Sequence, residues 1–420
     1  MTTGQKVVLT LLAVSLLAGL ATGGRLYYRL SVFWSLLFFG SWLWSLFSLR
    51  SILFKRSART IRAQVGQIFE ERFEVQNQNR FPRLWLEIRD QTTLPGSDGS
   101  RVLTMVMGRQ SRSYLARVRL IKRGVFPLGP TTLATGDLFG LFPVEKEISE
   151  QDSLLVYPMM VEIKGFPNPP GLLPGGEALR RRTHQVTPNA AGVRDYNTGD
   201  PLNRIHWLST ARRGRLIVKE FELDPLADVW IFLDGASNVQ ASIQQAPADY
   251  YAKDFWTRSS RYPLPPSTEE YGITIAASVV RDYLRRGRAV GLACAGQHLT
   301  LISPDRGGRQ LGKILEALAL IQTKGDLPLH ALIQTQVKHM VRGSTVVLIT
   351  PSTFREEALV VDFLMQRGLK PIVVLLDAAS FGGAPGTDQL AESIKLLGIP
   401  YRMVKKDADI SATLSDGYSR

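Results

Sequence analysis

The sequence predicts a multidomain protein with an N-terminal transmembrane helical hairpin, an antiparallel β-sandwich and a doubly wound α/β domain. Three observations lead to this prediction. Two long apolar stretches open the chain, short alternating runs broken by Gly, Pro, Asn and Asp follow, and apolar strands then alternate with helical patterns. The 420 residues are enough for two or three domains, each with its own core.

Residues 1–62 are predicted to hold two transmembrane helices, at about 7–24 and 30–49, and a basic juxtamembrane segment. The second stretch has 20 residues without a charge and would rise about 30 Å as a helix, which matches the hydrocarbon core. A cleaved signal peptide is the alternative for the first stretch, which follows Lys6. Either alternative leaves everything after Leu49 in the cytoplasm. Basic residues after the second helix support this orientation and are expected to face anionic headgroups: Arg50, Lys55, Arg56, Arg59 and Arg62.

Residues 63–160 are predicted to form the sandwich, because no helical pattern of normal length interrupts them. A Pro- and Gly-rich linker is expected at 161–180. The candidate strands are Gln67–Gln76, Leu84–Arg89, Arg101–Met107, Ser113–Ile121, Gly129–Thr135 and Leu154–Tyr157.

Residues 226–420 are predicted to form the α/β domain. Continuous apolar runs are typical of parallel strands that are covered on both faces, and the functional crevice of such a sheet lies at the carboxyl ends of its strands. The runs are Val229–Leu233, Ala289–Ala293, Val346–Ile349 and Ile372–Leu376, and the helical patterns between them include Arg355–Arg367 and Thr387–Leu397.

The net charge of +14 is concentrated in two segments. Residues 1–62 carry eight basic and no acidic residues, and residues 180–222 carry nine basic and four acidic residues. The rest of the chain is almost neutral, which weakens an inference to nucleic acid. A single cysteine, Cys294, excludes an internal disulfide framework and any Cys-rich metal site, and it is expected to be buried in a strand.

The most informative segment lies at 181–225. It contains Arg194-Asp195-Tyr196, the turn Gly199-Asp200-Pro201, and the run Arg204-Ile205-His206-Trp207 followed by Ala211-Arg212-Arg213. This segment resembles the hallmark of the bacterial and archaeal family known as domain of unknown function 58. The runs Arg123–Gly129 and Gly136–Phe142 are similar to β-domain signatures of the same family. The resemblance implies that residues 226–420 form a von Willebrand factor A-like domain.

Two interpretations of the hallmark segment remain open. Asp200 could cap a helix through Asn203–Ala211, with the arginines paired internally to nearby carboxylates. Alternatively, the segment binds an anionic partner. The candidate partner-binding residues are Arg180, Arg181, Arg182, Arg194, Asp195, Tyr196, Gly199, Asp200, Arg204, Trp207, Arg212 and Arg213.

The same resemblance raises the question of metal binding, because von Willebrand-type domains often hold Mg²⁺ at the strand ends. Asp234 matches the first ligand of that pattern, but Ala236 and Asn238 replace hydroxyl ligands. The degenerate set is Asp234, Ser237, Asn238 and Thr350, with Asp377 as a substitute carboxylate. Since Mg²⁺ prefers octahedral oxygen ligands that include carboxylates, we expect a crevice without metal and no cofactor. The five histidines show no metal-ligand spacing, and no catalytic residues are predicted.

The sequence therefore predicts a non-enzymatic, two-pass membrane protein with its soluble domains in the cytoplasm. The resemblance implies an adaptor or scaffold role beside a MoxR-type AAA+ ATPase and a transglutaminase-like membrane protein, in complex assembly, maturation or envelope processes. One alternative is a hydrolase that uses the crevice near Asp234. The other is a protein that binds nucleic acid or anionic lipid through its arginines, of which nucleic acid is disfavoured.

Overall fold

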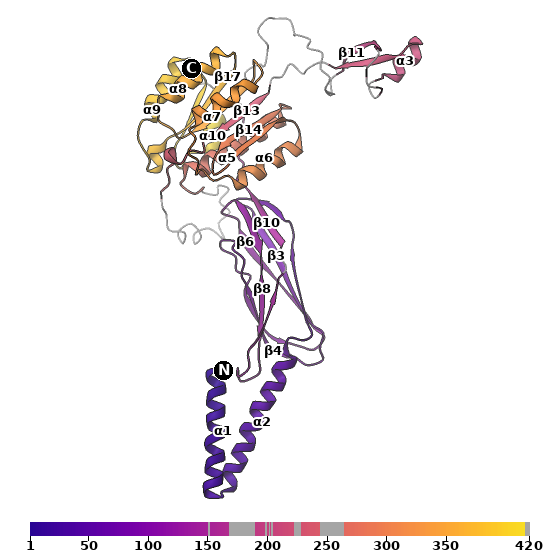
Figure 1. The fold of residues 1–420 in the computed structure, drawn as a ribbon, viewed down its shortest axis with the longest axis vertical. Helices are drawn as coiled ribbons and strands as arrows, with labels where there is room; N and C mark the ends of the chain where they lie inside the picture. Colours follow the sequence, from indigo (N-terminus) through magenta and orange to yellow (C-terminus); the bar gives the residue numbers. More distant parts are fainter. Residues whose placement is uncertain are drawn as a thin grey trace. The chain divides into compact units, whose positions relative to one another are not determined.

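The computed structural model describes residues 1–149, 152–167, 190–197, 200, 202, 205–221, 228–243 and 264–415. The described residues up to Pro158 form one compact unit, and those from Met159 onward form a second. Each unit is treated by itself below (Figure 1).

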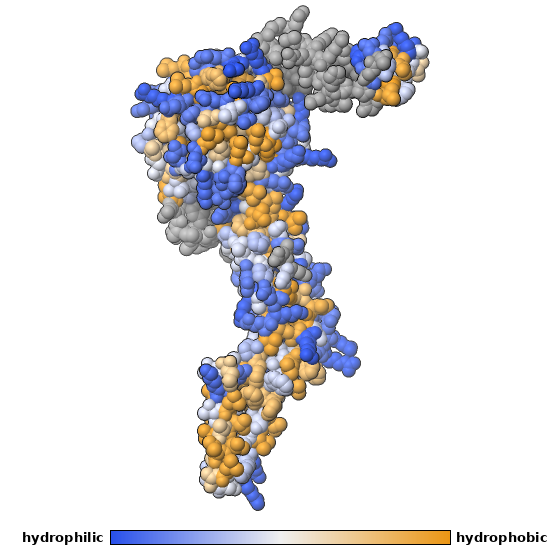
Figure 2. Space-filling view, viewed as in Figure 1, coloured by the Kyte–Doolittle hydropathy of each residue, from blue (hydrophilic) through white to orange (hydrophobic). Residues whose placement is uncertain are grey.

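The first unit begins with a helical hairpin. Helices α1 (Thr3–Thr22) and α2 (Arg25–Ser48) are joined at Gly23, whose φ of 66° lies in the left-handed region. Both helices are long and apolar enough to cross a membrane. Small residues are buried between them, and the Ser31 hydroxyl donates to the Ser15 hydroxyl at 3.1 Å. Large apolar side chains face outward and cover most of the visible hairpin surface in Figure 2 (orange), an arrangement typical of helices that pack in lipid.

Three sheets follow the hairpin. Sheet β1-β3-β6 and sheet β5-β4-β8-β9 are antiparallel and share an apolar core that includes Phe73, Leu86 and Leu133. The third sheet, β2-β10-β7, contains a parallel pair, β2 with β10, which the expectation of a wholly antiparallel sandwich did not include. The strands are β1 (Ile52–Ala58), β2 (Arg62–Gln64), β3 (Ile68–Asn77), β4 (Arg83–Asp90), β5 (Arg101–Val106), β6 (Ser111–Arg119), β7 (Gly124–Leu128), β8 (Thr131–Thr135), β9 (Val144–Ile148) and β10 (Asp152–Tyr157).

The basic segment after α2 is part of these sheets, since β1 begins at Ile52 rather than near residue 63. The expectation that Arg56 faces headgroups was wrong. Its guanidinium is buried and bonds Glu71 at 2.8 Å and Asp90 at 2.9 Å, beside the Phe73 ring. A buried guanidinium with two carboxylates satisfies most of its donors inside the protein. Arg56 therefore holds the two main sheets together instead of contacting lipid.

The second unit contains a six-stranded sheet in the order β15-β14-β13-β16-β17-β18. Neighbours pair in parallel except at the edge, where β15 is antiparallel to β14. Numbered from β13, the order is 3-2-1-4-5-6, a doubly wound arrangement. The strands are β13 (Val229–Leu233), β14 (Val290–Ala295), β15 (Leu299–Asp305), β16 (Thr345–Thr350), β17 (Lys370–Leu376) and β18 (Tyr401–Val404).

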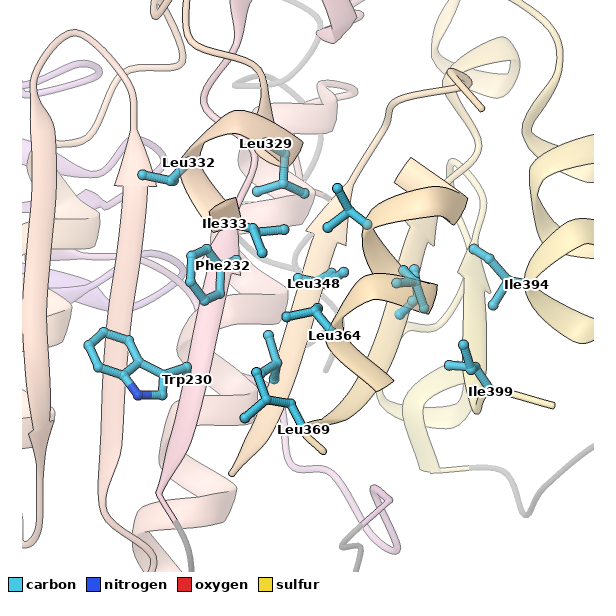
Figure 3. Packing of buried hydrophobic residues seen from close by; sticks show 14 of the residues in the cluster. Trp230, Phe232, Leu329, Leu332, Ile333, Leu348, Leu364, Leu369, Ile394 and Ile399 are labelled. Carbon is cyan, nitrogen blue, oxygen red and sulfur yellow. The ribbon is translucent and has the colours of Figure 1, made fainter. Parts of the chain in front are cut away.

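Helices cover both faces of this sheet. Trp230 and Phe232 of β13 lie on the face that α7, α8 and α9 cover, with Phe232 beside Ile333 of α7 (Figure 3), while α5 packs on the other face against Leu233 and Ile349. The helices are α5 (Thr268–Arg285), α6 (Gly308–Leu320), α7 (Leu329–Gln336), α8 (Glu356–Gln366), α9 (Thr387–Leu396) and α10 (Ile410–Ser415), with short 3₁₀ helices η2 (Ser237–Val239), η3 (Val337–His339) and η4 (Ala378–Phe381).

The start of the predicted linker is packed rather than free. Ile163 and Phe166 are buried, and the Phe166 ring meets the Tyr283 ring of α5 edge-on at 5.8 Å. The remainder of the linker lies outside the described residues. Cys294 is fully buried in β14 as expected, and burial raises the pKa of its thiol to about 12.

A smaller sheet belongs to the hallmark segment. Strands β11 (Ala190–Asp195) and β12 (Ile217–Phe221) pair antiparallel, and helix α3 (Trp207–Arg213) lies between them in sequence. The segment 190–221 is called the hairpin module below.

Candidate functional site

Asp234 and Thr350 meet at the carboxyl end of the large sheet. They follow β13 and end β16, two parallel neighbours in which Leu233 lies opposite Ile349. The Thr350 hydroxyl donates to Asp234 Oδ2 at 2.6 Å, and the Ala236 N–H donates to Oδ1 at 3.1 Å. Asp234 is 2% exposed, and this burial raises the pKa of its carboxyl. Parallel pairing of β13 with β16 thus brings these two side chains together.

The other residues of the degenerate metal set do not join this pair. Ser237 and Asn238 lie in η2 with exposed side chains, and the Ser237 N–H donates to the Gly325 carbonyl at 2.8 Å. The described residues contain no group of three His, Cys, Asp or Glu side chains placed to hold a metal ion. Asp234 is the one carboxylate among Asp234, Ser237, Asn238 and Thr350, so the set does not fit Mg²⁺, which prefers several oxygen ligands that include carboxylates. Asp234 is also only 2% exposed, so the packing around it would have to open before it could reach a substrate as the base of a hydrolase.

Glu357 is a titratable group near this site that the sequence analysis did not identify. It lies in the first turn of α8, 4% exposed, and burial raises its pKa to about 8, with a further contribution from Asp234. His330 Nδ1 is 3.6 Å from Glu357 Oε1, and Glu357 Oε2 accepts no hydrogen bond from the residues that the structure describes. The available signal was the apolar spacing of Val360 and Val361, which places Glu357 on the same helix face.

The hairpin module is held together by its own polar contacts. Arg194 of β11 makes two bonds to the Asp200 carboxylate, at 2.8 and 2.7 Å, and the Asn197 N–H donates to the same carboxylate at 2.9 Å. Arg215 pairs with Asp195 at 3.1 Å. The alternative in which hallmark arginines pair internally therefore describes Arg194, whose carboxylate partner is Asp200, while the Asp195 carboxylate pairs with Arg215.

The hallmark helix differs from the prediction. It begins at Trp207 instead of Asn203, and His206 rather than Asp200 is its N-cap, with Nδ1 accepting from the Ser209 N–H at 3.2 Å. The helix is anchored on β12, because the Ile217 N–H donates to the Thr210 hydroxyl at 3.1 Å. His206 thus has a structural role in the module.

One side of the module is apolar and exposed. Trp207 and Leu208 are 66% and 62% exposed in the first turn of α3, and Leu202 is exposed just before it. Arg212 and Arg213 are exposed in the last turn and make no ion pair within the described part of the chain. Leu202, Trp207, Leu208, Arg212 and Arg213 are called the α3 surface below. Three of them, Trp207, Arg212 and Arg213, are partner-binding candidates from the sequence. Tyr196 is partly exposed beside β11, while Arg180, Arg181, Arg182, Gly199 and Arg204 lie outside the described residues.

Comparison with known proteins gives a family match over part of this region. The family model described as "Protein of unknown function DUF58" matches residues 192–252, which include most of the hairpin module and β13. A relative from Bacillus subtilis (strain 168), "Uncharacterized protein YeaD", is 22% identical over 317 residues. That match covers 73% of this chain and 72% of the relative.

Solved structures give only weak likenesses. The CARDB domain of the PF1109 protein from Pyrococcus furiosus has a TM-score of 0.20 and 9% identity, and the match covers 26% of this chain and 96% of that one. A GH20 exo-β-N-acetylglucosaminidase from Vibrio harveyi has a TM-score of 0.17 and 9% identity over 83% of this chain and 60% of that one. Neither supports an argument about fold or activity.

Proposed function

We propose that this protein is a membrane-anchored adaptor that recruits a cytoplasmic partner protein through the α3 surface. In this proposal α1 and α2 span the membrane as a hairpin, and both soluble parts face the cytoplasm. The α/β part is a von Willebrand factor A-like domain, which its doubly wound order and the position of Asp234 after the first strand support.

The observation that carries the proposal is the exposure of Trp207 and Leu208 on a seven-residue helix. Tryptophan is the residue most enriched at binding hot spots, because it buries a large area and loses little conformational entropy. Here Ile217 and Val218 of β12 already fill the small core of the module. The two exposed side chains are therefore available to a partner.

Charge adds direction to this surface. Arg212 lies one turn after Leu208, on the same helix face. An apolar centre with arginines at its rim suits a partner with an apolar pocket and acidic residues around it. We assign this role to a MoxR-type AAA+ ATPase, with a transglutaminase-like membrane protein as a further member of the assembly.

Affinity capture of the full chain in detergent, with and without ATP, tests the proposal. The wild type should recover an AAA+ ATPase, and the double variant Trp207→Ala, Leu208→Ala should lose it. Truncation of a hot-spot aromatic costs at least about 2 kcal/mol, or roughly thirty-fold in affinity. The variant Leu396→Ala removes a leucine of α9 that is 90% exposed and should bind like the wild type.

Failure to recover an AAA+ ATPase under both conditions would refute this partner. Equal recovery by the wild type and the Trp207 variant would refute the surface. Steeply salt-dependent binding of the wild type to nucleic acid would instead favour the anionic-ligand alternative.

A further inference from the structure

Three loops lie at the end of the sandwich where α2 enters it. The register fixes this arrangement: Ile52, just after α2, pairs with Asn77 at the end of β3, and Arg83 at the start of β4 pairs with Val106 at the end of β5. Strand β8 also ends at this side, since the Thr135 hydroxyl donates to the Trp85 carbonyl. The loops are 78–82, 107–110 and 136–143, called the proximal loops below.

These loops present large apolar side chains to solvent. Leu138 and Phe139 are 65% and 64% exposed, and Phe81 in the neighbouring loop is 63% exposed. Met107 is also exposed, in loop 107–110. Apolar side chains gathered on one end of a soluble domain are unfavourable in water and typically mark an interaction surface.

The conformation of the third loop keeps its apolar tip outward. The buried Asp137 carboxylate accepts from the Phe139 N–H at 3.0 Å and from the Phe142 N–H at 2.7 Å. Gly140 adopts a φ of 67°, which lets the chain reverse. Leu141 is buried beneath the tip, so Leu138 and Phe139 project away from the sandwich.

A contact with the N-terminal helical hairpin determines the position of these loops along the normal of a bilayer that α1 and α2 span. The Thr2 hydroxyl donates to the Leu141 carbonyl at 3.0 Å, which ties loop 136–143 to the start of α1. Helix α1 rises about 30 Å from Thr3 to Thr22, which equals the hydrocarbon thickness. A loop bonded to Thr2 therefore lies in the headgroup layer when α1 spans the membrane.

The charge of the loops matches this position. Arg80 and Arg109 are exposed in the first two loops, and Arg50 is exposed just after α2. The only acidic residue in the proximal loops is Asp137, which is buried and bonded to backbone N–H groups. Exposed arginines next to apolar side chains suit an anionic lipid surface.

We propose that the proximal loops form a membrane contact additional to the helical hairpin, in which Phe81, Leu138 and Phe139 enter the headgroup layer of anionic lipids. Arg80 and Arg109 bind the lipid phosphates around them. This inference rests on the proposed membrane anchor. It explains why the run Gly136–Phe142 combines a locked backbone with an exposed Leu-Phe tip.

Site-specific fluorescence of the full chain in proteoliposomes tests the inference. An environment-sensitive dye is attached to the single variants Phe139→Cys, Phe81→Cys, Leu36→Cys and Ile61→Cys. Cys294 needs no replacement, because it is fully buried and its pKa is raised to about 12, so the unvaried chain serves as the labelling control. Leu36 is exposed in mid-helix, and Ile61 is exposed at the opposite end of the sandwich.

The expected result is that dyes at 139 and 81 are quenched by spin-labelled lipids and protected from aqueous iodide, as at 36, whereas the dye at 61 is quenched only by iodide. The double variant Arg80→Glu, Arg109→Glu should weaken the loop contact by about five-fold or more per arginine, and only in anionic vesicles. Quenching at 36 with iodide-only quenching at 139 and 81 would overturn the inference and leave the anchor intact. Iodide-only quenching at 36 would overturn the anchor itself.

Discussion

Glu357 carries the largest pH effect that the structure predicts for the α/β domain. Burial raises the pKa of this carboxyl from 4.5 to about 8, whereas the unfolded chain keeps the ordinary value. The folded state therefore binds a proton that the unfolded state releases above pH 4.5. Stability contributed by this group is fully present below pH 4.5 and is lost as the pH rises toward 8.

The magnitude follows from the two pKa values. Between pH 5.5 and pH 8 the free energy of unfolding falls by about 3 kcal/mol, because the unfolded chain releases a proton that the folded chain still holds. This value follows from linkage at 1.36 kcal/mol for each pKa unit. The variant Glu357→Gln keeps the shape and removes the titration. Its free energy of unfolding should exceed that of the wild type by about 1 kcal/mol at pH 5.5 and by about 4 kcal/mol at pH 8.

Pulse proteolysis in urea measures this difference, because it reports the unfolding of each part of a multidomain chain by the fragments that disappear. The fragment that contains β13 to β18 is followed in detergent at both pH values. Glu356→Gln is the matched control, since Glu356 is exposed in the same helical turn, and its effect should stay within about 0.5 kcal/mol. A stability difference for Glu357→Gln that does not change with pH would refute the reasoning.

The remaining predictions concern buried polar contacts. Arg56→Met should destabilise the sandwich by about 3–5 kcal/mol, because it leaves two buried carboxylates unpaired; an unchanged urea midpoint would contradict this. Thr350→Val should cost about 1–3 kcal/mol by removing the hydroxyl donor of buried Asp234, while Thr350→Ser should stay close to the wild type in the same urea assay. Ser31→Ala removes the bond to Ser15 and should weaken the hairpin by about 0.6 kcal/mol, measured by unfolding in mixed SDS micelles.

Apolar runs made the large sheet predictable. The four central strands coincide with predicted runs, because strands covered on both faces are continuously apolar. The edge strand β15 was missed, since its burial alternates and it contains Pro304 and Asp305, residues that are depleted in strands. The meeting of Asp234 and Thr350 follows from parallel pairing. The spacing of Val360 and Val361 places Glu357 on the buried face of α8, but the raised pKa of its carboxyl depends on tertiary packing.

The basic residues after α2 show that proximity to a transmembrane segment in the sequence does not mean proximity to it in the folded protein. Strand β1 runs away from α2 for seven residues, or about 23 Å, so Arg59 and Arg62 lie at the far end of the sandwich rather than against headgroups. Arg56 turns inward. Besides Arg50, exposed arginines at the α2 end of the sandwich include Arg80 and Arg109, which antiparallel pairing brings back to this end.

In the proposed membrane contact, the positive charge near the bilayer is therefore supplied by the fold. A positive-inside bias acts on the chain near the helix ends during insertion, before the sandwich exists, and needs only sequence proximity. Attraction of the folded protein to anionic lipid falls off within a Debye length of the surface, about 8 Å in physiological salt, and needs spatial proximity. Arg59 and Arg62 are close to the helix end in sequence, and Arg80 and Arg109 are close to it in space. Arg50 is close in both respects. The charge reversals Arg59→Glu and Arg62→Glu should thus disturb the topology without weakening the lipid contact of the folded loops. The charge reversals Arg80→Glu and Arg109→Glu should weaken the lipid contact and leave the topology unchanged.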